Sequence, residues 1–170
     1  FDGPIRNISR ALAKKTENSL SRQHHESTIT VSEAMTYGNP SLKSVVSKLQ
    51  SNGGTEFLFL PLYPQYATAT TAAAADQVNR AFADLSFPNF RFIREYHDHP
   101  AYIHAVTKSI EAYSSFLDEG ALLLFSFHGI PLAQVQAQAE NAEKADSYPD
   151  QCQHSAELIA HALGLSEDQW

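Results

Sequence analysis

The sequence predicts an α/β fold in which helices cover both faces of a parallel sheet. Short apolar runs, such as 57–60 and 122–125, are long enough for one buried strand and too short for a helix. Segments with helical periodicity, such as 42–49 and 101–117, alternate with these runs along the chain. This alternation is typical of right-handed βαβ units, which build parallel sheets.

The composition is that of a globular chain of 170 residues, enough for one ordinary domain or for parts of two smaller ones. A net charge of −7 argues against a nucleic-acid partner. The one cysteine, Cys152, favours a reducing, cytoplasmic location. No apolar run of about 18 residues predicts a membrane span, and no signal peptide is apparent. The first residue, Phe1, and a capping-box pattern that opens at Ser166 suggest an excerpt of a longer chain.

In the first half of the chain, glycine and proline separate the predicted elements. A helix follows Pro4, a strand begins at Thr28 and ends at Gly38, and an amphipathic helix covers 42–49. The next strand, 57–60, runs directly into Pro61-Leu62-Tyr63-Pro64-Gln65-Tyr66. Two prolines exclude this segment from a sheet interior, so we expect it to leave the carboxyl end of the strand.

The second half repeats the pattern. A strand is expected at 90–94, a helix at 101–117, an exposed helix after Pro131 that continues to 145, and a helix at 150–163 that buries Cys152. Because Cys152 lies on the apolar stripe of the last helix, it is expected to pack in the core rather than to react.

Two polar clusters have more than one interpretation. Thr68, Thr70 and Thr71 precede an alanine-rich helix, where their hydroxyls either cap the helix or help its N–H groups bind an anion. His97 and His99 are either metal ligands or polar residues of a connecting loop. The sequence alone leaves both choices open.

His128 is the strongest candidate for chemistry. It follows the predicted strand 122–127, at the strand end where open α/β sheets bind ligands. Ser126, Gly129 and Pro131 surround it and end the strand. The alternative is a core histidine that caps the strand end.

Four segments together resemble the ferrochelatase family. Residues 60–66 are similar to its Pro-Gln-Tyr-Ser pattern, and 126–131 are similar to its Ser-x-His-x-x-Pro segment. Residues 146–152 resemble its Gly-Asp-x-Tyr-Pro-x-Gln turn, and 37–41 also match. The four motifs have the same order as in the family, and the resemblance, most like the bacterial enzymes, covers essentially the whole chain.

The resemblance implies a Rossmann-like, chelatase-like fold with three α/β/α layers and two similar halves that enclose a porphyrin cleft. Residues 1–98 would be the latter part of the first half, and 99–170 the opening part of the second half, which carries the His128 loop. The first strand of the family would lie upstream of this chain, and a glutamate that completes the metal site would lie downstream.

The implied function is ferrochelatase activity, a lyase reaction that inserts Fe²⁺ into protoporphyrin IX or coproporphyrin III to form haem. His128 would be the catalytic and metal-binding residue, which delivers iron or accepts protons. Tyr148 would support its loop. The residues implied to contact the porphyrin are Tyr63, Pro64, Gln65, Tyr66, Ser126 and Pro131. This chain, being only part of the family length, is expected to be inactive alone.

The chain departs from the family pattern at four positions. Pro4 replaces the serine that follows Gly3, Ala67 replaces the serine after Gln65-Tyr66, and Ala145 replaces a glycine. Thr68 stands where some members have a cluster-ligating cysteine, so we expect no iron–sulfur cluster and no tightly bound cofactor.

The expected partners are porphyrin and Fe²⁺. Peripheral membrane association stays open, and the sequence does not fix the oligomeric state. Two other functions remain: a related chelatase for another metal and tetrapyrrole, and a porphyrin- or haem-binding protein without catalysis.

Overall fold

The structure is a computed structural model, and it describes residues 3–83, 89–113, 115, 120–141 and 147–170. The chain forms two compact units. The first unit comprises Phe1–Phe57 and Ala74–Phe90, and the second unit comprises Leu58–Ala73 and Arg91–Trp170.

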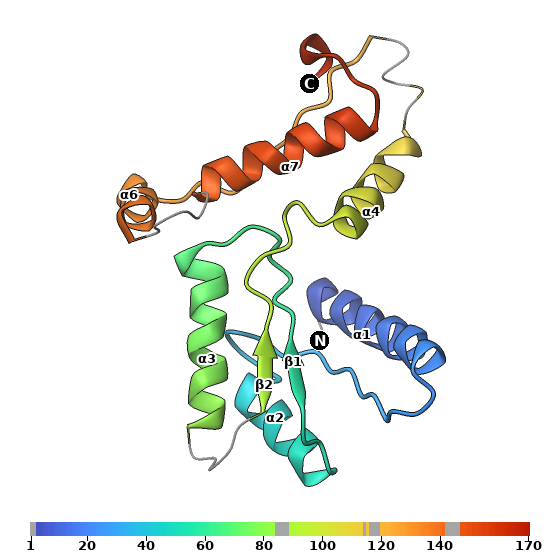
Figure 1. Cartoon of the computed structure of the whole chain (residues 1–170), viewed down its shortest axis with the longest axis vertical. Helices are drawn as coiled ribbons and strands as arrows, with labels where there is room; N and C mark the ends of the chain where they lie inside the picture. Colours follow the sequence, from blue (N-terminus) through green and yellow to red (C-terminus); the bar gives the residue numbers. More distant parts are fainter. Residues whose placement is uncertain (1–2, 84–88, 114, 116–119, 142–146) are drawn as a thin grey trace. The chain divides into compact units, whose positions relative to one another are not determined.

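In chain order the elements are α1 (Pro4–Gln23), α2 (Leu42–Ser51), β1 (Phe57–Phe59), the π-helical turn η1 (Thr68–Ala72), α3 (Ala73–Phe82), β2 (Phe90–Phe92), α4 (Pro100–Glu111), α6 (Leu132–Asn141), α7 (Tyr148–Ala162) and the 3₁₀ turn η2 (Glu167–Gln169). Helices and strands alternate as the sequence predicts only across β1, α3 and β2, whereas helices follow one another before and after this stretch in the described residues (Figure 1). No helix in these described ranges combines the length and apolar character that crossing a bilayer requires.

β1 and β2 are hydrogen-bonded neighbours in a small sheet. The N–H of Phe57 donates to the Asn89 carbonyl at 3.0 Å, and the N–H of Ile93 donates to the Phe59 carbonyl at 2.9 Å. Residue numbers rise together along both strands, so the pair is parallel. With α3 as the crossover helix, this is the predicted βαβ unit, and the α/β class is confirmed.

The aromatic core of the first unit forms where α3 meets the strands. Phe82 of α3 is 3% exposed, and its ring centroid lies 5.2 Å from that of Phe57 and 5.0 Å from that of Phe90. Val78, one turn earlier, is also buried. These contacts place the predicted apolar side of α3 against the strands. Figure 1 shows the helix running beside the strands.

The predicted strand from Thr28 is wrong. Residues 28–34 run without a ladder, and one isolated bridge joins Met35 to Ser41. The Glu17 carboxylate on α1 accepts the N–H of Val31 at 2.7 Å. A side chain therefore binds the backbone N–H of Val31, which a neighbouring strand would otherwise bind. Residues 28–34 form an extended segment bonded to α1 and not a strand.

The predicted buried strand 122–127 is also wrong. Leu122 and Leu124 are 68% and 87% exposed, and these residues belong to no strand. The N–H of Leu123 donates instead to the Gln169 carbonyl at 2.9 Å. A buried strand needs hydrogen-bonded neighbours along its length, whereas the partner of Leu123 is a short turn.

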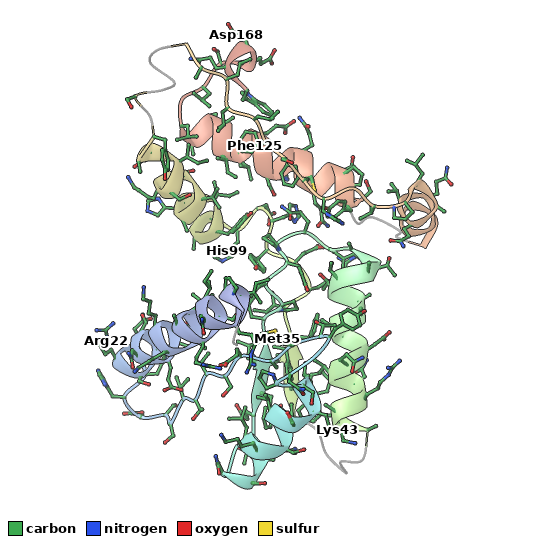
Figure 2. The ribbon with its side chains drawn as sticks, turned by 180° about the vertical axis from the view of Figure 1, so that it is seen from behind. Arg22, Met35, Lys43, His99, Phe125 and Asp168 are labelled. Atoms are coloured by element: carbon green, nitrogen blue, oxygen red, sulfur yellow. The ribbon has the colours of Figure 1, made fainter. Side chains whose placement is uncertain are left out.

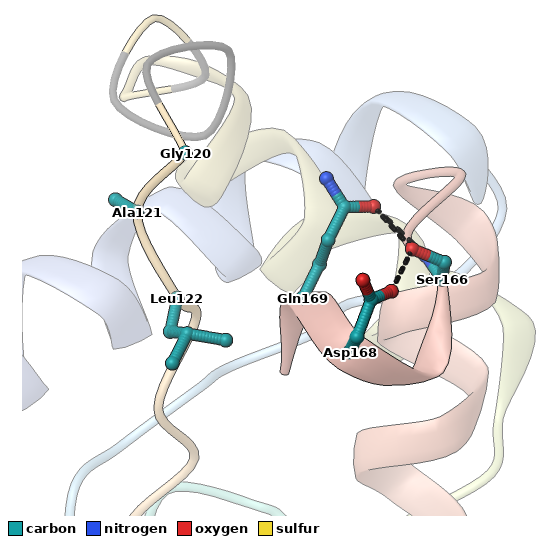
Figure 3. Close-up of a pocket in the computed structure, with 6 residues that line it drawn as sticks. All are labelled: Gly120, Ala121, Leu122, Ser166, Asp168 and Gln169. Carbon is teal, nitrogen blue, oxygen red and sulfur yellow. Dashed lines mark hydrogen bonds between the residues drawn. The ribbon is translucent and has the colours of Figure 1, made fainter.

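That turn is the capping box predicted at Ser166 (Figure 3). The Ser166 hydroxyl lies 2.5 Å from an Asp168 carboxylate oxygen and 2.8 Å from the Gln169 side-chain oxygen. The turn shapes an open depression beside residues 120–122. None of the predicted site residues lines this depression, so it is not the candidate site.

α4 and α7 pack against each other in the second unit. α4 ends at Glu111, earlier than predicted, so Tyr113 lies beyond it and is 64% exposed. α7 begins at Tyr148 because Ser147 and Asp150 form a capping box before it. Cys152 is 6% exposed on α7, which confirms its predicted burial. The predicted exposed helix ends at Asn141 as α6, and its predicted continuation to 145 lies outside the described residues.

Candidate functional site

α7 joins the two segments that the sequence assigns to the site. Its residues Tyr148, Gln151 and Ser155 recur at i, i+3 and i+7, which places them on one face of the helix. Tyr148 contacts the segment 126–131, whereas Gln151 and Ser155 contact the segment 61–66. All of these residues belong to the second unit.

His128 lies in the extended segment before α6, and it is exposed. The Tyr148 hydroxyl donates to the His128 backbone carbonyl at 2.9 Å. This bond fixes the main chain of His128 and leaves its imidazole exposed. The alternative of a core histidine is therefore wrong, and the predicted supporting contact of Tyr148 is present.

An open apolar pocket of about 550 Å³ surrounds this contact, within the size range of small-molecule sites. Most of its lining is apolar, and His128, Tyr148 and Cys152 supply polar atoms. The pocket is lined by Leu123, Leu124, Phe125, Phe127, His128, Gly129, Ile130, Leu132, Val135, Tyr148, Pro149, Cys152, Gln153, Ala156 and Trp170. Such a lining suits a largely apolar ligand. None of the six residues expected to contact porphyrin lines this pocket: Ser126 and Pro131 are exposed and lie outside the lining, and so do residues 63–66.

The Tyr148 hydroxyl and the Cys152 thiol face a desolvated environment. Burial, followed by the interaction with Cys152, raises the pKa of Tyr148 from 10.0 to about 12. Burial also raises the pKa of the Cys152 thiol, although its bond with Tyr148 opposes the shift. Both groups therefore stay protonated at neutral pH, so Tyr148 remains a donor to His128.

The segment 61–66 leaves β1 as predicted and is held by its polar groups. The Gln65 side-chain amide donates to the Ser155 hydroxyl at 3.0 Å, and the N–H of Tyr66 donates to the Gln151 side-chain oxygen at 2.8 Å. The Pro64 carbonyl accepts the N–H of Tyr96 at 2.9 Å. Every one of these bonds reaches a residue outside the segment.

The ring of Tyr66 has its own support. The Arg94 guanidinium lies 3.9 Å from the ring centroid, a cation–π distance. Arg94 also pairs with the Glu95 carboxylate at 2.8 Å, and Gln151 donates to the same carboxylate oxygen at 2.8 Å. One face of the Tyr66 ring is thus covered by Arg94. Tyr63 is 39% exposed.

Sequence reasoning gave no role to Gln151, although it lies in the motif 146–152, and it missed Ser155, Arg94 and Glu95. The available signal was on α7, where two polar residues fall on the same stripe as Cys152, and both are fully buried in the structure. Buried polar side chains need partners, so a polar residue on an apolar stripe predicts a specific hydrogen bond. Arg94 and Glu95 carried no comparable signal.

The structure shows the local contacts of the two ambiguous polar clusters. Thr71 is 1% exposed and Thr70 donates to the Ala67 carbonyl at 3.3 Å, so these hydroxyls do not form an exposed row. The His99 ring accepts the N–H of Ala101 at 3.2 Å and caps α4 (Figure 2). Buried His97 packs edge-on against His154. Within the described ranges, no three potential ligands are grouped around a metal position, which favours the connecting-loop interpretation.

We expect the Tyr148 contact to make stability depend on alkaline pH. Its pKa is about 12 in the fold and 10.0 ordinarily, so folding favours the protonated form. The contribution is fully present below pH 10 and is lost as the pH rises towards 12. Urea denaturation at stepwise pH should therefore show a smaller alkaline decline for Tyr148→Phe than for the unsubstituted protein. Tyr37→Phe, at a 76% exposed tyrosine, is the control; an equal change in both variants would contradict the assignment.

The ferrochelatase family model matches residues 2–170. The chain belongs to the ferrochelatase family. It is 42% identical over 167 residues to the ferrochelatase of Vibrio parahaemolyticus, an alignment that covers 98% of this chain and 48% of the relative. It is 35% identical over 170 residues to the ferrochelatase of Psychrobacter arcticus, covering 99% of this chain and 48% of the relative.

A third ferrochelatase, from Vibrio cholerae, is 46% identical over 136 residues, which cover 79% of this chain and 40% of the relative. The chain therefore spans about half the length of the curated ferrochelatases that it matches. The resemblance inferred from the four motifs is confirmed at the level of the family.

Proposed function

We propose that the full-length protein is a ferrochelatase that inserts Fe²⁺ into protoporphyrin IX or coproporphyrin III to form haem. Family membership over residues 2–170 supports this proposal. The observation that carries it is the attachment of both motif segments to one face of α7, through Tyr148 to His128 and through Gln151 to Tyr66. A porphyrin and its metal need a wall for the ring and a basic group near its centre.

The chemistry fits the residues in hand. Insertion exchanges one Fe²⁺ for two pyrrole protons, so the site must strip water from the metal and accept protons. A neutral imidazole can ligate Fe²⁺ or take a proton near neutral pH, and we assign one of these roles to His128. We assign ring contact to the predicted set Tyr63, Pro64, Gln65, Tyr66, Ser126 and Pro131. The apolar pocket beside His128 is lined by other residues than this set, and it supports a largely apolar macrocycle next to the imidazole.

The finer features of the proposal follow the family. Residues 1–98 would complete a first Rossmann-like half and 99–170 would open the second. Fe²⁺ is a substrate, and no cluster is held through Thr68. We also propose a cytoplasmic location for the protein. Iron and sulfide analysis of the purified full-length protein tests the cluster; stoichiometric sulfide would refute its absence.

The test of function is anaerobic Fe²⁺ insertion by the full-length protein on each porphyrin. We expect haem to form with at least one of them. Preference for another divalent metal would favour a related chelatase. Tight porphyrin binding without turnover would favour a binding protein. The 170-residue chain should show no multiple turnovers in the same assay, because the implied partner glutamate of His128 is not in this sequence.

A further inference from the structure

We propose that Gln151 is a positioning residue that fixes Tyr66 against the porphyrin, with Glu95 and Arg94 completing the support. This inference rests on the proposed function, which supplies the porphyrin that Tyr66 would contact. Gln151 has no predicted contact with porphyrin or metal. It would act only through the segment 61–66.

The four residues form a closed ring of contacts. The N–H of Tyr66 donates to Gln151, Gln151 donates to Glu95, and Arg94 pairs with Glu95, each at 2.8 Å. Arg94 then returns to Tyr66, with its guanidinium 3.9 Å from the ring centroid. Tyr66 is therefore held at both its backbone and its ring, which fixes the direction in which the uncovered face of the ring points.

Among the four residues of this ring, Gln151 depends most on its hydrogen bonds, because it is fully buried. Its exposure is 0%, so its amide cannot exchange these partners for water. Removing the amide would leave the Tyr66 N–H and the Glu95 carboxylate without their bonds to it. Ser155, also fully buried, supports the same segment by accepting from Gln65. By contrast, the Arg94 side chain is 45% exposed, so its loss is expected to matter less.

The spacing on α7 gives this support a functional meaning. Tyr148 holds the backbone of His128, and Gln151 holds that of Tyr66. Tyr148 and Gln151 are three positions apart on one face of α7, which corresponds to a rise of about 4.5 Å along the helix axis. Metal insertion requires the porphyrin to be placed accurately against the imidazole, and small misplacements cost rate. One turn of α7 therefore holds the backbone of His128 and the backbone of Tyr66 at a fixed spacing.

The test uses Gln151→Met in the full-length protein, because methionine keeps the length of the side chain and removes both hydrogen bonds. We expect kcat/KM for porphyrin to fall about 10- to 100-fold, as for a small misplacement of a substrate. The fall should include a rise in KM for porphyrin with KM for Fe²⁺ unchanged, whereas a general loss of folded protein would lower kcat and leave both KM values unchanged. Glu157→Met, at an exposed position of α7, is the matched control and should keep full activity.

A swap variant tests the hydrogen bonds themselves. Gln151→Glu keeps an acceptor for Tyr66 but sets two carboxylates against each other. Combining it with Glu95→Gln restores a donor and an acceptor, and it should recover most of the lost kcat/KM. Recovery supports the proposal, and failure of the double variant to exceed Gln151→Glu overturns it.

Arg94→Gln keeps the proposal testable if Gln151→Met fails to fold. Its expected effect is a loss of about two- to fivefold in kcat/KM for porphyrin, the range of an exposed cation–π contact. An unchanged value would overturn the proposal. Equal kinetics for Gln151→Met and Glu157→Met, with an active unsubstituted protein, would overturn this inference alone. An inactive unsubstituted protein would overturn the proposed function and this inference with it.

Discussion

Replacement of His128 by alanine in the full-length protein is expected to abolish most iron insertion without disturbing the fold. The imidazole is exposed, and the Tyr148 bond reaches the backbone carbonyl, which alanine retains. A positioned acid–base group contributes about 10²- to 10⁴-fold to rate, so a loss in that range is expected. Anaerobic insertion kinetics, with circular dichroism to verify folding, measure the effect.

His161→Ala is the matched control, because His161 is an exposed histidine of α7 outside the pocket lining. It should retain the activity of the unsubstituted protein. A loss of less than about tenfold in His128→Ala would place the essential proton or metal chemistry on another residue. A rise in KM for Fe²⁺ would indicate metal delivery by His128, whereas a fall in kcat alone, rescued by added imidazole, would indicate proton acceptance.

Phe82→Ala is expected to have the largest effect on stability. Phe82 is 3% exposed and contacts the rings of Phe57 and Phe90. Truncation removes buried apolar surface and leaves a cavity, which together cost about 3–5 kcal/mol for a buried phenylalanine. Urea denaturation of the 170-residue chain, followed by circular dichroism, should show this fall in the free energy of unfolding.

Tyr113→Ala is the control for an aromatic residue outside the core, since Tyr113 is 64% exposed. Its effect should stay within about 0.5 kcal/mol. A loss below about 2 kcal/mol in Phe82→Ala would mean that α3 can collapse onto the strands and fill the space.

The βαβ unit of the first half could be predicted because its signals are local. The apolar run at 57–60, the apolar positions Val78 and Phe82, and the alternation around 90–92 each specify one element and the face it buries. The two prolines of 61–66 likewise predicted that this segment leaves the end of β1. Cys152 was correctly placed in the core by the stripe on which it lies.

The two incorrect strand predictions show that an apolar run does not specify which backbone will pair with it. The runs near Thr28 and Leu122 have strand composition, but a strand exists only where another backbone pairs with it. In this chain Val31 is bonded to Glu17 and Leu123 to Gln169. Composition reports the preference of a segment, whereas its hydrogen-bond partner is set by what lies beside it.

The sequence by itself determined the α/β class and the family, and it singled out His128, Tyr66 and Tyr148 as candidate site residues. It did so because periodicity and motif spacing are properties of neighbouring positions. Only the tertiary structure decided how these residues are supported. The bonds from Tyr66 to Gln151 and from Gln65 to Ser155 span 85 and 90 positions. Such pairings form when packing removes polar groups from water and leaves only the groups packed beside them as partners, a choice that no local pattern encodes.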